Sequence, residues 1–252
     1  MLSNASAIAI RIGDWDWAAR EVAEAAQSPN DLAAQMRHAE IQGLRGQDVE
    51  QELQRIADVV ADMTEVQAIA SVDEIRAEVA FARGDDARAL DFARRSYRLS
   101  LAPDSTTVQT AARAAARSGD LDGVREAINA LEGQPGRVSV ATRREAESAI
   151  AVLEGRRSDG LAGYIDAIRR WRELGLEFEA AVCALNLITL VGPGEIESRA
   201  AGLFAGGIFQ RVGASPHHAL LERAMGAVVA ASPPKREAPV VDETRASAAP
   251  AE

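Results

Sequence analysis

The sequence predicts an all-α fold, a right-handed α-solenoid of about six helical hairpins followed by a C-terminal capping helix. Glycines recur along the chain at intervals of 33 to 38 residues, which is the spacing of helical-hairpin repeats. The segments between them have the amphipathic period of a helix, and none sustains the alternation that marks a strand. Only 4% of the residues are aromatic although 47% are hydrophobic. Alanine and leucine, the best helix formers, must therefore fill most of the core.

The glycines mark the turn inside each expected hairpin. They are Gly13, Gly46, Gly84, Gly119, Gly155 and Gly192. Each one ends a helical pattern, because glycine supplies the left-handed conformation that closes a helix. Asp14, Asp85 and Asp120 follow three of these glycines directly and are good N-caps for the next helix.

The segments between the glycines carry apolar faces at helical spacing. In the fourth expected hairpin one face contains Val108, Ala111, Ala112 and Ala115. In the fifth it contains Leu161, Ile165, Ile168 and Trp171, and in the sixth Phe178, Ala181, Val182, Leu185 and Ile188. This spacing of three and four residues predicts helices that bury one side.

The two ends of the chain differ from the repeats. The leading helix of the first hairpin has only about ten residues before Gly13 and lacks the polar outer face of a capping repeat. We therefore expect the array to continue upstream, in a longer protein or in a partner. Near the other end the chain becomes polar and rich in proline and alanine. This predicts a solenoid over residues 1–232 and a disordered tail over residues 233–252.

Residues 84–99, Gly-Asp-Asp-Ala-Arg-Ala-Leu-Asp-Phe-Ala-Arg-Arg-Ser-Tyr-Arg-Leu, resemble the second half of a tetratricopeptide repeat. In that family small residues lie five positions after the turn glycine, seven positions further on, and seven positions before the glycine, where they let paired helices approach. The matching residues are Ala89, Ala18, Ser96, Ala25, Ala77, Ala39, Ala112, Ser6 and Ser148. Gln51 stands where alanine is expected, and the early tryptophan and the tyrosine of the family are mostly missing. The resemblance therefore implies the fold without the peptide-clamp role of the best-known members.

The last third has a narrower resemblance. Ile168-Arg-Arg-Trp171-Arg-Glu-Leu174-Gly175 and Ile208-Phe209-Gln-Arg-Val212-Gly213 resemble segments of the C-terminal, MalT-like helical region of large bacterial signalling ATPases. Those proteins combine a cyclase or a LuxR-type DNA-binding domain with an ATPase and tetratricopeptide repeats. This chain has no Walker A sequence, no cyclase domain and no helix-turn-helix after the repeats. The resemblance implies a binding region of such a system rather than its catalytic part.

The charge balance restricts the partners. A net charge of −10 argues against nucleic acid and anionic membranes, which bind basic surfaces. No apolar run approaches the ~20 residues that cross a bilayer, and the N-terminus lacks a signal peptide. We expect a cytoplasmic protein with a protein partner. The arginine groups at positions 94, 95 and 98 and at 169, 170 and 172 are expected to be solvated helix faces paired with neighbouring acids.

We identify no catalytic, cofactor-binding or metal-binding constellation and expect no enzyme and no cofactor. Cys183 is the only cysteine and lies in an apolar helical run, so a buried thiol is expected. His217 and His218 point in different directions on a helix, which makes a poor metal site, and both are expected at a surface helix start. Trp15 and Trp17 lie in the first turn, where packing is favoured over a binding role.

The expected functional surface is the concave face, which the first helix of each hairpin lines. The positions of Gly84 and Gly119 place Glu74, Glu78, Gln109, Arg113 and Arg117 there. The last three are four residues apart, opposite the alanine face, so we expect partly exposed guanidinium groups that contact an acidic or polar segment of a partner. An ordinary solvated polar face is the alternative.

These features predict a non-catalytic scaffold for protein–protein interaction, the sensory or assembly arm of a bacterial signalling system. The alternative is a ligand-sensing regulatory domain that binds a small inducer and controls an ATPase or cyclase on another chain.

Overall fold

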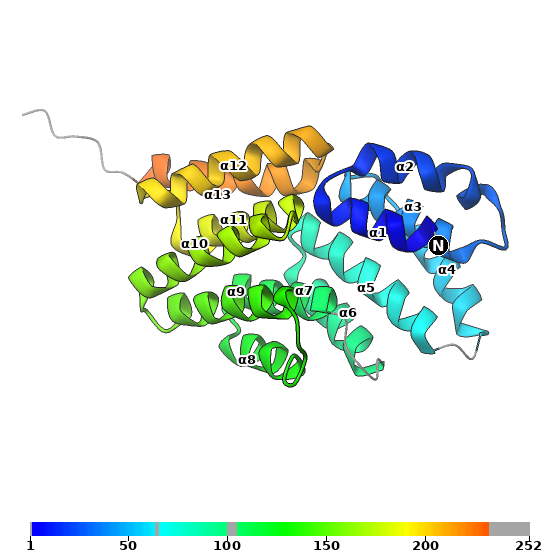
Figure 1. Cartoon of the computed structure of the whole chain (residues 1–252), viewed down its shortest axis with the longest axis horizontal. Coiled ribbons are helices and arrows are strands. Elements are labelled where there is room, and N and C mark those ends of the chain that lie inside the picture. The colour runs from blue at the N-terminus through cyan, green and yellow to red at the C-terminus, as the bar shows by residue number, and fades with distance from the viewer. Residues whose placement is uncertain (1, 64–65, 100–104, 232–252) are drawn as a thin grey trace, which may run out of the picture.

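The computed structural model describes residues 2–63, 66–99 and 105–231, and all regular elements within them are helical. The predicted tail, residues 233–252, lies outside the described residues. Figure 1 shows the helices in chain order. They are α1 (Leu2–Ile12), α2 (Trp15–Ala23), the 3₁₀ helix η1 (Ala25–Gln27), α3 (Leu32–Leu44), α4 (Glu50–Ala61), α5 (Val66–Arg83), α6 (Asp86–Leu99), α7 (Ser105–Arg117), α8 (Leu121–Ala130), α9 (Arg137–Leu153), α10 (Arg157–Glu173), α11 (Glu177–Val191), α12 (Ile196–Val212) and α13 (Ser215–Ala231).

The turn glycines have the predicted conformation. All six have a positive φ, from 74° at Gly119 to 100° at Gly46, and each follows a helix directly or within two residues. The Asp120 side chain caps the helix after its glycine by accepting a hydrogen bond from the Gly123 amide at 2.8 Å. Gly213, with a φ of 73°, ends α12 in the same way. The prediction for these turns is confirmed.

The helices form an inner and an outer set. Each helix packs on its neighbours in the chain, and α1, α3, α5, α7, α9 and α11 also form a series of contacts, each with the next. Among the described even-numbered helices up to α12, only α10 and α12 make a comparable contact. The chain therefore curves with the odd-numbered helices inside. The curve returns on itself, because α11 packs against α1 and α13 covers parts of α3, α5 and α11 (Figure 1).

The small residues lie where helices approach closely. The five that precede the turn glycines by seven positions are all buried: Ser6, Ala39, Ala77, Ala112 and Ser148. Ala18, Ala89 and Ser96 are buried as well, whereas Gln51 is exposed. At Ser148 the partner is also small, because a Cβ at Gly163 of α10 would overlap the serine Oγ. Small side chains on both helices thus permit the close contact of α9 with α10.

Larger side chains fill the space between the layers. Trp15 is buried, and its Nε1 donates a hydrogen bond to the Ile10 carbonyl at 2.9 Å. Trp17 is half-buried against the same core. Cys183 is fully buried, as expected from its apolar run. Among the described helices, none combines the length and the apolar character that crossing a bilayer requires.

Candidate partner-binding surfaces

The five residues of the predicted concave face lie on inner helices, Glu74 and Glu78 on α5 and Gln109, Arg113 and Arg117 on α7. Glu74 is half-buried, and the side chains of the other four are buried. The expected partial exposure of the two guanidinium groups is therefore wrong. The physical reason is the return of the chain, because α11 and α13 cover the inner face. Whether these residues contact a partner stays a prediction.

Arg113 makes its ion pairs inside the molecule. Its Nε donates to Glu145 Oε1 of α9 at 2.8 Å, and its Nη2 donates to Oε2 of the same carboxylate at 3.0 Å. Its Nη1 donates to Glu179 Oε2 of α11 at 2.8 Å. Glu145 also accepts hydrogen bonds from Trp171 Nε1 at 3.1 Å and Asn186 Nδ2 at 3.2 Å. A bidentate arginine–carboxylate pair of this kind is strong and directional.

Arg11 extends this set to the first helix. Its Nη1 donates to Glu179 Oε1 at 2.7 Å, and its Nη2 pairs with Glu78 of α5. The result is an inner ionic cluster of Arg11, Glu78, Arg113, Glu145 and Glu179, contributed by α1, α5, α7, α9 and α11. Arg11, Glu145 and Glu179 were not among the residues predicted from the sequence. One signal was present for Glu179, which lies in a helix buried on nearly every side.

Two carboxyl groups of the cluster, those of Glu179 and Glu78, have pKa values shifted in opposite directions. Burial alone would raise the pKa of Glu179, but the positive charges of Arg113 and Arg11 lower it to about 2. Burial raises the pKa of Glu78 to about 8 despite the Arg11 charge, and the nearby Glu40 acts in the same direction. Burial and the neighbouring acid therefore oppose the effect of Arg11 at Glu78, whereas two arginines outweigh burial at Glu179.

His217 of α13 is buried, with an exposed fraction of 2%, so the expected surface position is wrong. Its ring lies 5.4 Å from the Phe178 ring and 5.3 Å from the Phe209 ring, measured between centroids. Burial, with the positive charge of Arg117, lowers the pKa of His217 to about 3. His217 is buried because α13 packs across α5 and α11. His218 remains partly exposed near Glu222.

The interior around the cluster is nearly filled. A cavity of about 20 Å³ lies between Arg11, Glu78, Arg113 and His217. A second, of about 10 Å³, lies beside Gln109, Glu145 and Asn186. Each has room for about one water molecule.

A larger hollow lies on the outer side, between α10 and α12, with a volume of about 630 Å³. Its apolar lining includes Ile165, Ile168 and Phe204, and the Arg172 guanidinium lies 5.1 Å from the Phe204 ring centroid. We call this hollow the α10–α12 groove. Charged side chains also line it: Arg169, Arg172, Glu173, Glu177 and Glu197.

Beside the groove, α12 exposes apolar side chains. Ile196 is 81% exposed and Leu203 is 69% exposed. Ala200 and Gly207 are also exposed, and each lies four residues, about one helical turn, after Ile196 and Leu203 respectively. These residues form one continuous apolar strip along α12, and sequence periodicity alone did not distinguish it from a core face.

Five of the six arginines in the two groups pair with acids, as expected, whereas Arg172 lies against the Phe204 ring. Arg94 and Arg98 contact Glu126, and Arg95 contacts Asp73. On α10, Asp166 accepts hydrogen bonds from Arg169, Arg170 and Arg144. The hydrogen bonds from Arg170 and Arg169 lower the pKa of Asp166 to about 2.

Comparison of the chain with protein-family models, with curated proteins and with solved structures gives no match. Among the described residues, no group of three or more His, Cys, Asp or Glu side chains is arranged to hold a metal ion.

Proposed function

We propose that this chain is a non-catalytic module for protein–protein interaction, built as an α-solenoid of six tetratricopeptide-like hairpins. In this view the hairpins are α1–α2, α3–α4, α5–α6, α7–α8, α9–α10 and α11–α12, with α13 as the capping helix. The left-handed glycine inside each pair and the contacts among the odd-numbered helices support it. Helical repeats of this type commonly present extended binding surfaces.

The observation that carries the proposal is the α10–α12 groove with its neighbouring apolar strip. Exposed apolar side chains gathered in one place and rimmed by charge mark interaction surfaces of soluble proteins. Both helices have 17 residues, which corresponds to a length of about 25 Å. A groove between two such helices suits an amphipathic helix that places apolar anchors at successive turns.

The filled interior favours this outer surface over the concave face. Arg113 already uses its three nitrogens on Glu145 and Glu179, so a partner would have to break those pairs. The two described interior cavities admit about one water molecule each, so neither is large enough for the small inducer of the alternative function. The resemblance to bacterial signalling ATPases supports the role of this chain as the sensory or assembly arm of such a system.

Selection from a displayed library of random 16-residue peptides tests the proposal. We expect selected peptides to be amphipathic helices. Their affinity should fall at least about fivefold with Leu203→Asp, which places a charge in the strip, because one anchor contact is typically worth more than ~1 kcal/mol. Ala200→Trp should weaken binding as well, since an indole there occupies the groove.

The matched control is Ile8→Asp, which changes another exposed isoleucine on α1. Circular dichroism should show the same helix content for all three variants. Equal loss of affinity with Ile8→Asp, or no loss with Leu203→Asp and Ala200→Trp, contradicts the groove as the binding surface.

A further inference from the structure

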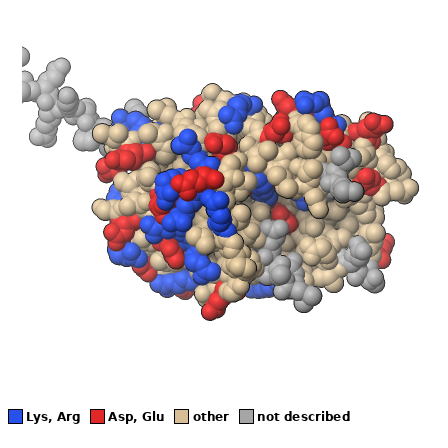
Figure 2. Space-filling model, in the orientation of Figure 1, with Lys and Arg blue, Asp and Glu red and all other residues tan. Residues whose placement is uncertain are grey.

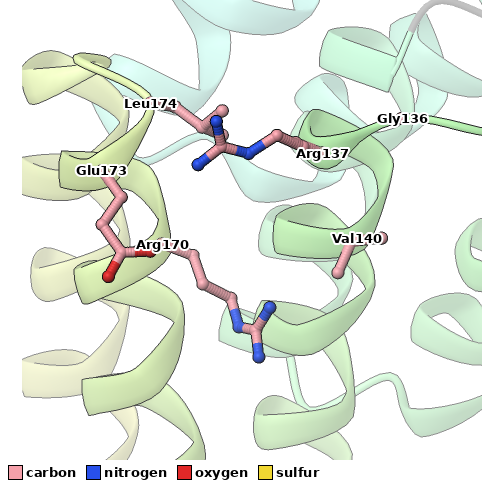
Figure 3. Close-up of a pocket in the computed structure, with 6 residues that line it drawn as sticks. All are labelled: Gly136, Arg137, Val140, Arg170, Glu173 and Leu174. Carbon is pink, nitrogen blue, oxygen red and sulfur yellow. The ribbon is translucent and has the colours of Figure 1, made fainter.

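A separate pocket of about 450 Å³ lies between the start of α9 and the end of α10. It is lined by Gly136, Arg137, Val140, Arg170, Glu173 and Leu174. Figure 3 shows that the Arg137 and Arg170 side chains extend into the space between the two helices from opposite sides. Their guanidinium groups occupy different parts of the pocket. The volume suits a few side chains of a bound segment.

The two arginines have free donors. Arg170 uses its Nε on Asp166 Oδ2 at 2.9 Å, and within the described residues its two terminal nitrogens have no acceptor. Arg137 is exposed and makes no ion pair or hydrogen bond with any described side chain. By contrast, Arg169 beside them pairs with both Asp166 and Glu173. Within the described residues, the pocket therefore presents the unpaired Arg137 guanidinium and the two terminal nitrogens of Arg170.

The surrounding surface is positive on an acidic protein. Residues 137–174 carry eight arginines against six acidic residues, whereas the whole chain carries 28 basic and 38 acidic residues. One of the six, Glu145, is buried in the inner ionic cluster. Figure 2 shows Arg side chains gathered on the face formed by α9 and α10. Such a local excess attracts negatively charged groups.

The other residues that line the pocket restrict the kind of ligand that fits it. Val140 is 51% exposed and, with Leu174, gives the pocket an apolar wall (Figure 3). The Glu173 carboxylate repels an anion on its own side, which keeps carboxylates toward the two arginines. Separate cationic positions with an apolar wall between helices suit two carboxylates joined by an apolar stretch better than one compact anion.

We propose that this α9–α10 pocket binds an acidic segment of a partner polypeptide. Arg137 and Arg170 each take one carboxylate, and an apolar side chain of the segment packs on Val140 and Leu174. The inference rests on the proposed function and specifies its partner. The pocket and the α10–α12 groove share Glu173, so one partner can contact both across α10. No aromatic side chain lines the pocket, so the stacking contacts that bind single-stranded nucleic acid are missing there.

The test uses the full chain and a fluorescein-labelled peptide, acetyl-Glu-Glu-Leu-Leu-Glu-Glu-amide, followed by fluorescence anisotropy. We expect binding that weakens with added salt, because exposed charge contacts are screened. The same peptide with glutamine in place of glutamate should bind at least about tenfold more weakly, since it loses the charge contacts of both arginines. Arg137→Gln with Arg170→Gln should weaken binding of the acidic peptide about fivefold or more.

The matched control is Arg20→Gln with Arg223→Gln, which removes the same charge from two exposed arginines elsewhere. It should leave the affinity within about twofold, because distant exposed charges are screened. Arg137→Gln alone removes no hydrogen bond or ion pair with a described side chain and should still weaken binding. This single variant keeps the test valid if the double variant loses helix content.

Three outcomes overturn the proposal: no measurable binding of the acidic peptide, equal affinity for parent and pocket variants, or equal loss in the control. Tighter binding of labelled oligothymidylate through the same two arginines overturns it too and makes nucleic acid the occupant. These results are independent of Leu203→Asp. If Leu203→Asp weakens binding of the selected peptides, while the pocket variants bind the acidic peptide as tightly as the parent does, the proposed function stands and this inference fails.

Discussion

The inner ionic cluster and the α9–α10 pocket both contain arginines, whose side chains are more deeply buried in the cluster than in the pocket. Arg113 is 6% exposed, and its ion pairs join residues 32 and 66 positions apart in the chain. Arg170, on the surface, pairs with Asp166 only four residues away, and Arg137 pairs with no described residue. The first region connects helices that are distant in the sequence, whereas the second leaves cationic groups open to solvent.

The difference teaches that burial decides what an arginine does in this protein. A buried ion pair loses the hydration of both partners, so removing one partner leaves an uncompensated charge. An exposed pair is screened by water and salt and contributes little to stability. The cluster should therefore control folding, and the pocket should control binding with little effect on folding.

The largest expected change in stability comes from substitution of Arg113. Arg113→Ala leaves Glu145 buried without its cation and Glu179 with Arg11 alone, and should lower the free energy of unfolding by about 3–5 kcal/mol. Urea unfolding followed by circular dichroism measures the change. Arg137→Ala in the pocket is the control and should change stability by less than about 0.5 kcal/mol. Similar losses for the two variants would remove the distinction between the regions.

A second comparison concerns packing. Ala89→Trp forces an indole into a fully buried helix contact and should destabilise the chain by about 1–3 kcal/mol or more. Ala200→Trp places the same ring at the exposed groove and should change the melting temperature by no more than a few degrees. If Ala89→Trp melts like the parent, the assignment of Ala89 to a tight helix contact is wrong.

The third prediction uses pH to examine the interior. Folded His217 stays neutral down to about pH 3, whereas the unfolded residue binds a proton below its ordinary pKa of 6.5. Between these values the unfolded state binds more protons, so stability should fall as the pH is lowered, by up to about 1.4 kcal/mol per pH unit. His217→Phe keeps a ring beside Phe178 and Phe209 and should reduce this slope between pH 6.5 and 4. An unchanged slope would show that other groups cause the acid sensitivity.

The smallest expected change in stability comes from substitution of Arg170. Arg170→Gln removes one partly exposed i, i+4 pair with Asp166, and such pairs contribute about 0.3–0.5 kcal/mol. Differential scanning calorimetry should therefore give a melting temperature close to that of the parent, while binding of the acidic peptide weakens. A large drop in melting temperature would mean that Arg170 has a structural role like that of Arg113.

Local patterns predicted much of the fold. The six turn glycines, the small residues at Ala39, Ala77 and Ala89, and the apolar face of α11 were all identified from spacing. The α10–α12 groove was not, because Ile196 and Leu203 have the helical spacing of core residues, and they are exposed since no helix among the described residues covers them. The α9–α10 pocket was also missed, since Arg137 and Arg170 are far apart in sequence and converge only when α9 packs on α10.

The sequence by itself determined the positions of the turn glycines and apolar faces such as that of α11. These properties depend on the conformation of single residues, such as the positive φ of glycine, and on a period of 3.6 residues. Only the tertiary structure decided that the chain returns far enough for α11 to contact α1. Small rotations between successive helices add up along the chain, and no local pattern records their sum. Arg11 therefore meets Glu179, 168 residues away, and the face predicted to be an open groove becomes the interior.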